Sequence, residues 1–245
     1  MRRYLIGGSS ILFLFILWMI FAGTIDNPYI LPGPLLVIKT LFSLLGNHET
    51  YLIIGQTFLR LVIAFAISSL LAIILGLFAG RHIYIDDFLH PIVATLRSIP
   101  IASVIVIILI IIGHGFSLYI ITFLMIFPII YEATKQGVLN INPDIKQAIA
   151  IENHKPLIIT YKLHLPLAMP YIRTAMFQSF GLGFKVIVMA EFIAQANRGI
   201  GRELFDGSIS INYAYVFAWT LIIIILVTIF ESTLKSIKKA YEETS

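Results

Sequence analysis

The residues of this chain with the clearest capacity for chemistry are polar side chains inside a long apolar segment. They recur at i, i+4, i+7 and i+11, a spacing that a helix turns to one face: Thr174, Gln178, Gly181 and Lys185. On a membrane helix, such a stripe is typical of a pathway for anions. We therefore interpret its polar members, together with Glu191 near the end of the same segment, as candidates for a translocation pathway.

A structural role is the alternative for the charged members of this set. Lys185 would pair with an acid such as Glu191, and Gln178 would bond across to a neighbouring helix. Six residues on a regular helix turn through roughly 600°, which leaves Lys185 and Glu191 about 120° apart. That pair therefore needs a kinked helix, for which Gly181 and Gly183 are the candidate positions. Both interpretations remain open.

Two of the arginines within apolar segments, Arg60 and Arg97, also need a functional and a structural interpretation, since charges there by default mark function. Arg97 follows Pro91 and is a further pathway candidate. In the alternative interpretation, the aliphatic part of the Arg97 side chain stays in the apolar region and the guanidinium snorkels to the cytoplasmic surface. Arg60 shares a helix face with Gln56. The alternative to a functional role for Arg60 is a structural one, in which its guanidinium hydrogen-bonds to backbone carbonyls at a helix contact.

Several kinds of active site are excluded by the sequence. It contains no G-x-x-x-x-G-K-[ST] nucleotide loop and no H-E-x-x-H pair among its six histidines. The absence of cysteine excludes disulfides and thiolate sites. Ser232-x-x-Lys235 matches a catalytic motif only by letter, and His90, His114 and His164 are isolated. We predict no enzyme activity, no bound cofactor and no metal site in this chain.

The composition identifies the elements that must position these residues. Of 245 residues, 59% are hydrophobic and 12% are charged, with a mean hydropathy of +0.95. Soluble domains average about 25% charged residues. The chain is therefore expected to be one integral membrane domain spanning residues 1–245, surrounded by lipid. The net charge of +4 comes without a basic face, so no nucleic-acid partner is expected.

Apolar runs of membrane length predict an all-α bundle of about six transmembrane helices. The expected spans are residues 11–23, 51–79, 88–112, 118–132 or 138, 167–193 and 213–232. The third is expected to be interrupted at Pro91 and Pro100. A signal peptide is the alternative for the first span, although no small-x-small cleavage site follows it.

The charges predict the orientation of this bundle. Of the 17 lysines and arginines, ten fall on the side of the N-terminus, three on the opposite side and four within spans. By the positive-inside rule, both termini are cytoplasmic, including a charged tail at about 234–245. The long polar interval at about 139–166 is then cytoplasmic too.

This interval predicts a helix, a turn and a second short helix. Asn142 and Pro143 are typical of a helix start, and Asn153 is typical of a helix end. Pro156 suits the first turn of a second helix, which would run to Leu163. The first helix is too short to be stable alone, so we expect it to lie in a partner protein.

The interval resembles the coupling signature of membrane subunits of binding-protein-dependent ABC importers. That signature is E-A-A, three residues, G, nine residues and I-x-L-P. This chain has, at matching spacing, Gln147, Ala148, Ile149, Asn153, Leu163, Leu165 and Pro166. Gln147 replaces the family's Glu and Asn153 its Gly, substitutions that keep a hydrogen-bonding group and a feasible left-handed turn.

Further motifs resemble the subgroup that serves nitrate, sulfonate, taurine and thiamine-precursor importers. They are Thr57-x-x-Arg60 with Phe65, Leu96-Arg97-Ser98-Ile99-Pro100 with Ser98 where the subgroup has Pro, and Phe217-Ala218-Trp219-Thr220. Lys185, Ala190-Glu191 and Ile200-Gly201 are similar to one branch of it. The resemblance covers about residues 30–231.

The resemblance implies a type I importer permease in a bacterial inner or plasma membrane. It implies a permease dimer, expected to be a homodimer, whose coupling helices contact two cytoplasmic ABC ATPases that bind ATP and Mg. An extracytoplasmic binding protein or lipoprotein would deliver the solute. The expected substrate is a small anion such as a sulfonate or nitrate. A thiamine pyrimidine precursor is the alternative substrate. An ion-coupled transporter and a membrane-embedded enzyme are the alternative classes of protein.

Overall fold

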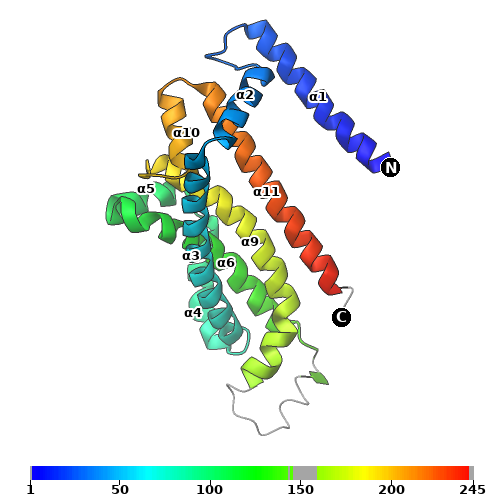
Figure 1. Ribbon diagram of the computed structural model, residues 1–245. Coiled ribbons are helices and arrows are strands. Elements are labelled where there is room, and N and C mark those ends of the chain that lie inside the picture. Colours follow the sequence, from blue (N-terminus) through cyan, green and yellow to red (C-terminus); the bar gives the residue numbers. More distant parts are fainter. Residues whose placement is uncertain (1, 143, 146–158, 243–245) are drawn as a thin grey trace.

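The computed structural model describes residues 2–142, 144–145 and 159–242. Every regular element in these ranges is helical, which confirms the predicted all-α class. The helices follow in order (Figure 1): α1 Arg2–Ile25, α2 Pro34–Leu45, α3 His48–Ala79, α4 Ile83–Ser98, α5 Ile101–Ile112, α6 His114–Leu139, the π-helix η1 Thr160–His164, α9 Leu165–Ile193, α10 Ile200–Ile209 and α11 Tyr213–Glu242.

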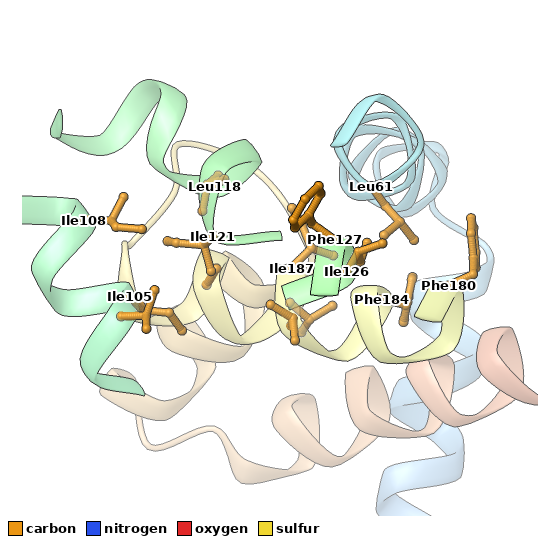
Figure 2. Packing of buried hydrophobic residues seen from close by; sticks show 14 of the residues in the cluster. Leu61, Ile105, Ile108, Leu118, Ile121, Ile126, Phe127, Phe180, Phe184 and Ile187 are labelled. Atoms are coloured by element: carbon orange, nitrogen blue, oxygen red, sulfur yellow. The ribbon is translucent and has the colours of Figure 1, made fainter. Parts of the chain in front are cut away.

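Helices α3, α6 and α9 form the centre of the bundle, with α6 in contact with both others. Figure 2 shows Leu61 of α3, Ile126 of α6 and Ile187 of α9 meeting there, all fully buried. Phe180 of α9 adds a stacked ring contact with Phe230 of α11 at 3.9 Å between centroids. These apolar faces hold the helices that carry the candidate pathway.

Glycines set how closely these helices approach. A Cβ on Gly76 would lie 2.7 Å from Thr134 Cβ, and one on Gly137 would lie 2.8 Å from Ala168 Cβ. Small residues at membrane helix contacts let backbones come close enough for dispersion to hold them. The α3–α6 and α6–α9 contacts therefore depend on the absence of a side chain at two positions.

The third predicted span is two helices, α4 and α5, bent by 104°. Within the described residues, five helices are long and apolar enough to cross a membrane, or six if this pair counts as one span. The break falls before Pro100, because Ile99 takes an extended conformation as residues before proline do. The predicted interruption at Pro91 was wrong, since α4 continues through it.

Two terminal helices extend beyond their predicted spans. The apolar part of α1 is unburied, and Trp18 attaches it by a 3.1 Å bond from Nε1 to the carbonyl of Pro32 and by stacking on Phe217. Helix α11 continues past Ser232 to Glu242. The predicted charged tail therefore begins as helix.

The bundle has two distinct ends. Figure 1 shows α2 and α10 at one end, and the α3–α4 turn and η1 at the other. Lys39, Arg198 and Arg202, the residues predicted to be outside, belong to the first end; Arg81 and Lys162 belong to the second. These five residues are therefore separated along the length of the bundle according to their predicted side.

Candidate translocation and coupling sites

The predicted coupling residues are divided between described and undescribed parts of the chain. Gln147, Ala148, Ile149 and Asn153 lie outside the described residues. Before them, the Oδ1 atom of Asn142 accepts a 2.8 Å hydrogen bond from the amide of Asp144. That bond is the helix-capping interaction which the sequence predicted at Asn142.

Beyond the undescribed stretch, the chain enters η1, a π-helix that contains Leu163. It continues without a break into α9, which begins at Leu165 and Pro166. The predicted short helix ending at Leu163 is therefore wrong at its C-terminal boundary. Single-turn π-helices are frequent at functional sites.

The side chain of Arg81 connects η1 to the rest of the bundle. Its Nη1 atom donates a hydrogen bond to Thr160 Oγ1, so the α3–α4 turn is joined to the start of η1. Nearby, Lys135 of α6 lies 2.9 Å from Asp86 of α4 and 3.3 Å from Glu132. This end of the bundle is therefore joined across helices by polar contacts.

Three of the five pathway candidates meet at one cleft. Arg97 of α4 and Thr174 and Gln178 of α9 line a space of about 530 Å³, whose remaining wall comes from α6 and from other residues of α9. Arg97 and Gln178 are exposed. The predicted stripe on α9 and the arginine of a different helix thus contribute to the same surface.

The polar groups of this cleft favour an anion. Glu132, the one acid in its wall, is neutralised by Lys135 and accepts a 3.0 Å bond from Gln136. Within the described part of the chain, the guanidinium of Arg97 has no hydrogen bond or ion pair. Arginine presents five donors in a fork that matches carboxylate and sulfonate-like oxygens. The available charge in the cleft is therefore positive.

The other half of the stripe lies outside this cleft. Gly181 lines a separate pocket of about 220 Å³ with Phe58, Phe184 and Phe230, which is almost entirely apolar. Lys185 is exposed on α9 and lines neither space. The structure therefore brings together Arg97, Thr174 and Gln178, and separates Lys185 from them.

Glu191 is bound in a buried network between α3, α9 and the start of α10. Its Oε1 atom lies 2.6 Å from Nη1 of Arg60, and both its oxygens are within 3.0 Å of the Thr57 hydroxyl. The amide of Gly201 donates to Oε2 at 3.0 Å, and the amide of Ile200 donates to Thr57 Oγ1 at 2.9 Å. We call these five residues the Glu191 network.

The partner of Glu191 is therefore Arg60, and the alternative pairing with Lys185 is not found. Glu191 is fully buried and directed toward α3, whereas Lys185 is exposed. Arg60 also donates a 2.6 Å bond to the carbonyl of Arg198, which is the helix-contact role considered for it. Arg60 and Glu191 are 131 positions apart in the sequence, so the geometry of a single helix could not predict their pairing.

One signal in the sequence did indicate the network. Three short motifs from distant parts of the sequence contribute to it: Thr57-x-x-Arg60, Ala190-Glu191 and Ile200-Gly201. Each motif contains or directly precedes a charged residue: Arg60, Glu191 and Arg202, respectively. Such residues in membrane segments pair with one another, so a search for partners across spans would have found it.

The chain resembles proteins of membrane transport systems. The family model for the binding-protein-dependent transport system inner membrane component matches residues 72–242. A probable ABC transporter permease protein of Brucella melitensis is 26% identical over 201 residues, covering 82% of this chain and 80% of that protein. The bicarbonate transport system permease protein of Synechococcus elongatus is 26% identical, covering 81% and 75%.

Two further similarities cover more of the known proteins. The taurine transport system permease protein of Escherichia coli is 23% identical over 239 residues, 95% of this chain and 86% of that protein. A chain of the MetNI methionine ABC transporter, solved in inward-facing conformations, superposes with a TM-score of 0.63 at 17% identity, covering 79% of this chain and 98% of that chain. This structural match confirms the predicted permease fold.

Proposed function

The chain belongs to the family of inner membrane components of binding-protein-dependent transport systems, and from that premise we propose how it works. It is the multi-pass permease subunit of an ABC importer, and it provides alternating access for a small anion. ATP and Mg are bound by a separate ATPase. This division of labour is consistent with the lack of a nucleotide-binding loop in the sequence.

The cleft between α4, α6 and α9 is the observation that carries the substrate class. Arg97 supplies an available positive charge, and Gln178 and Thr174 supply amide and hydroxyl groups. A volume of about 530 Å³ accommodates a small solute. The bicarbonate and taurine systems named for two relatives also carry small molecules with an anionic group.

The coupling role rests on the continuity between the polar interval and the bundle. The segment containing Gln147, Ala148 and Asn153 docks on the ATPase, and its movement is transmitted to η1, which continues into α9 without an intervening loop. Because Thr174 and Gln178 belong to α9, the same helix connects the docking segment with the cleft. ATP binding would therefore change the shape of the cleft directly.

The assembly is expected to be a permease dimer, most simply two copies of this chain, with two ATPases. The η1 end faces the cytoplasm, where the excess of positive residues lies. The α2–α10 end then faces the extracytoplasmic binding protein that delivers the anion. Specificity comes mainly from that protein, and the cleft adds a polar filter.

The charge in the cleft is tested by substituting Arg97. Arg97→Ala removes a charge-assisted hydrogen bond of about 1.5–3 kcal/mol, so anion uptake is expected to fall about 10- to 100-fold. Arg97→Lys keeps the charge and retains most of the uptake. The measurement is ATP-driven uptake of labelled taurine and bicarbonate by proteoliposomes that contain the ATPase and binding protein.

Lys185→Ala serves as a comparison, because Lys185 lies outside the cleft. Equal loss of uptake in Arg97→Ala and Lys185→Ala would place the pathway along the whole stripe. Native uptake in Arg97→Ala would contradict the anion cleft, and preferential uptake of an uncharged pyrimidine would favour a thiamine precursor.

A further inference from the structure

The Glu191 network lies where α9 meets the end of the bundle farthest from η1 (Figure 1). Helix α9 runs unbroken over 29 residues, which corresponds to about 44 Å at 1.5 Å per residue. Its first turn follows η1, and Glu191 is near its last turn. A carboxylate at this point is distant from the anion cleft, so the pathway does not account for its burial.

The network fixes α10 to both α9 and α3. Glu191 accepts from the amide of Gly201 in α10, while Thr57 of α3 accepts from the amide of Ile200. Arg60 of α3 completes the set by bonding both Glu191 and the carbonyl of Arg198, just before α10. Three backbone groups at or just before the start of α10 thus depend on two other helices.

The backbone at the start of α10 is shaped to this carboxylate. Gly199 has φ = 149°, a conformation that other residues rarely adopt, and a Cβ there would lie 2.5 Å from the Glu191 carboxylate. A Cβ on Gly201 would lie 2.2 Å from the carbonyl oxygen of Val188 and 2.5 Å from the amide of Phe192. A side chain at Gly199 would displace the Glu191 carboxylate, and one at Gly201 would require backbone atoms of α9 to move, so both positions require glycine at this spacing of α9 and α10.

We propose that the Glu191 network makes α10 a rigid extension of α3 and α9, so that movement at the η1 end of α9 is transmitted to the surface formed by α10. Glu191 and Arg60 are then positioning residues for the exchange between the permease and its binding protein. This inference rests on the proposed importer function. It adds a route by which the coupling segment and the opposite surface move together.

The energetic basis is the burial of the ion pair. Glu191 is fully buried, and the Arg60 side chain is only 18% exposed. Removing one partner of such a pair leaves an uncompensated charge, which is far more costly than the pair itself. The network therefore persists as a unit, and α10 does not separate from α3 during normal movement.

A distance measurement tests the rigid connection directly. The chain has no native cysteine, so spin labels can be attached at Leu52→Cys on α3 and Ile209→Cys on α10, both exposed positions. We expect one narrow distance distribution, identical in the nucleotide-free complex and in the complex trapped with ATP and vanadate. A change in this distance on trapping would overturn the proposal.

Substitutions test whether the connection matters for coupling. Gly201→Ala displaces α10, and Arg60→Met leaves the Glu191 charge without its partner. Coupling between sites corresponds to factors of about 5 to 150, so stimulation of ATP hydrolysis by the binding protein should fall about tenfold, with basal hydrolysis retained. Arg60→Lys should restore part of it. A variant that merely unfolds would lose basal hydrolysis as well.

Gly55→Ala on α3 is the matched control, because a Cβ there meets nothing within 4 Å. Native stimulation in both Gly201→Ala and Arg60→Met would overturn the proposal. If the native complex instead showed no ATP-driven uptake, the importer function would fail, while the Leu52–Ile209 distance would still report whether α10 is rigidly held.

Discussion

At the scale of single residues, the charged side chains of this protein fall into two groups. Some are buried and paired with an opposite charge, and one, Arg97, remains available to a ligand. Glu191 and Lys135 are buried and bound by opposite charges. Arg97 is exposed at a cleft without a partner among the described residues. Buried pairs fix helices relative to one another, whereas an available guanidinium can bind a solute. Intramembrane charge therefore has two uses in the same bundle.

Thr57 provides a residue-scale test of the Glu191 network. Thr57→Val keeps the shape but leaves the amide of Ile200 buried without an acceptor, which costs about 1–3 kcal/mol. Thermal unfolding in detergent should show this destabilisation. Thr220→Val, an exposed position whose hydroxyl bonds only to the carbonyl of Val216, is the control and should change stability by less than about 0.5 kcal/mol. Equal stability of the two variants would contradict the network.

At the scale of helices, close approach and continuity decide how the bundle works. Helices α3, α6 and α9 meet through glycines, and α9 connects η1, the cleft and the Glu191 network. Helix α9 is continuous over this length, whereas α4 and α5 are separated by a 104° break. Arg97 lies in the last turn of α4, beside this break.

Gly137 tests the α6–α9 contact. In Gly137→Ala the new methyl group would lie 2.8 Å from Ala168 Cβ and 3.0 Å from its Cα, so the two helices must separate. Overpacking of this kind costs about 1–3 kcal/mol, measured as a lower free energy of unfolding. Gly115→Ala in the same helix α6 has open space around it and should leave stability unchanged. A Gly137→Ala variant with the free energy of unfolding of the native protein would contradict this prediction and show that the two helices can adjust to the added methyl group.

The helices themselves were largely predictable, because apolar runs of membrane length leave few alternatives to helix. The break at Pro100 was also predicted, but the one at Pro91 was not found, since proline removes one hydrogen bond without deciding whether neighbours compensate for it. Helix periodicity correctly placed Thr174 and Gln178 together. It could not find the Arg60–Glu191 pair, which depends on packing between distant segments.

At the scale of the whole molecule, the two ends of the bundle carry different parts of the proposed cycle. The α3–α4 turn and η1 are at one end, and α2 and α10 are at the other (Figure 1). The cleft lies between α4, α6 and α9, and Thr174 in its wall is nearer in sequence to η1 than to Glu191. In the proposed cycle, the cleft responds to the ATPase and α10 meets the binding protein.

The orientation of these ends is tested with single cysteines in the cysteine-free chain. Tyr84→Cys, at an 85% exposed position beside the α3–α4 turn, should be protected from a membrane-impermeant maleimide in intact cells. Ile209→Cys on α10 should be labelled. After the membrane is permeabilised, both should react. The reverse pattern in intact cells would invert the proposed topology and place the polar interval outside.

In the proposed cycle, an ATPase drives transport through the segment containing Ala148. The most direct measurement is solute uptake by proteoliposomes containing this chain, its ATPase and the binding protein, with either native Ala148 or Ala148→Asp. We predict ATP-dependent uptake for the native complex and about tenfold or greater loss for Ala148→Asp, since coupling between sites is worth factors of about 5 to 150. Uptake that needs no ATPase, or unchanged ATP-driven uptake in Ala148→Asp, would contradict this account.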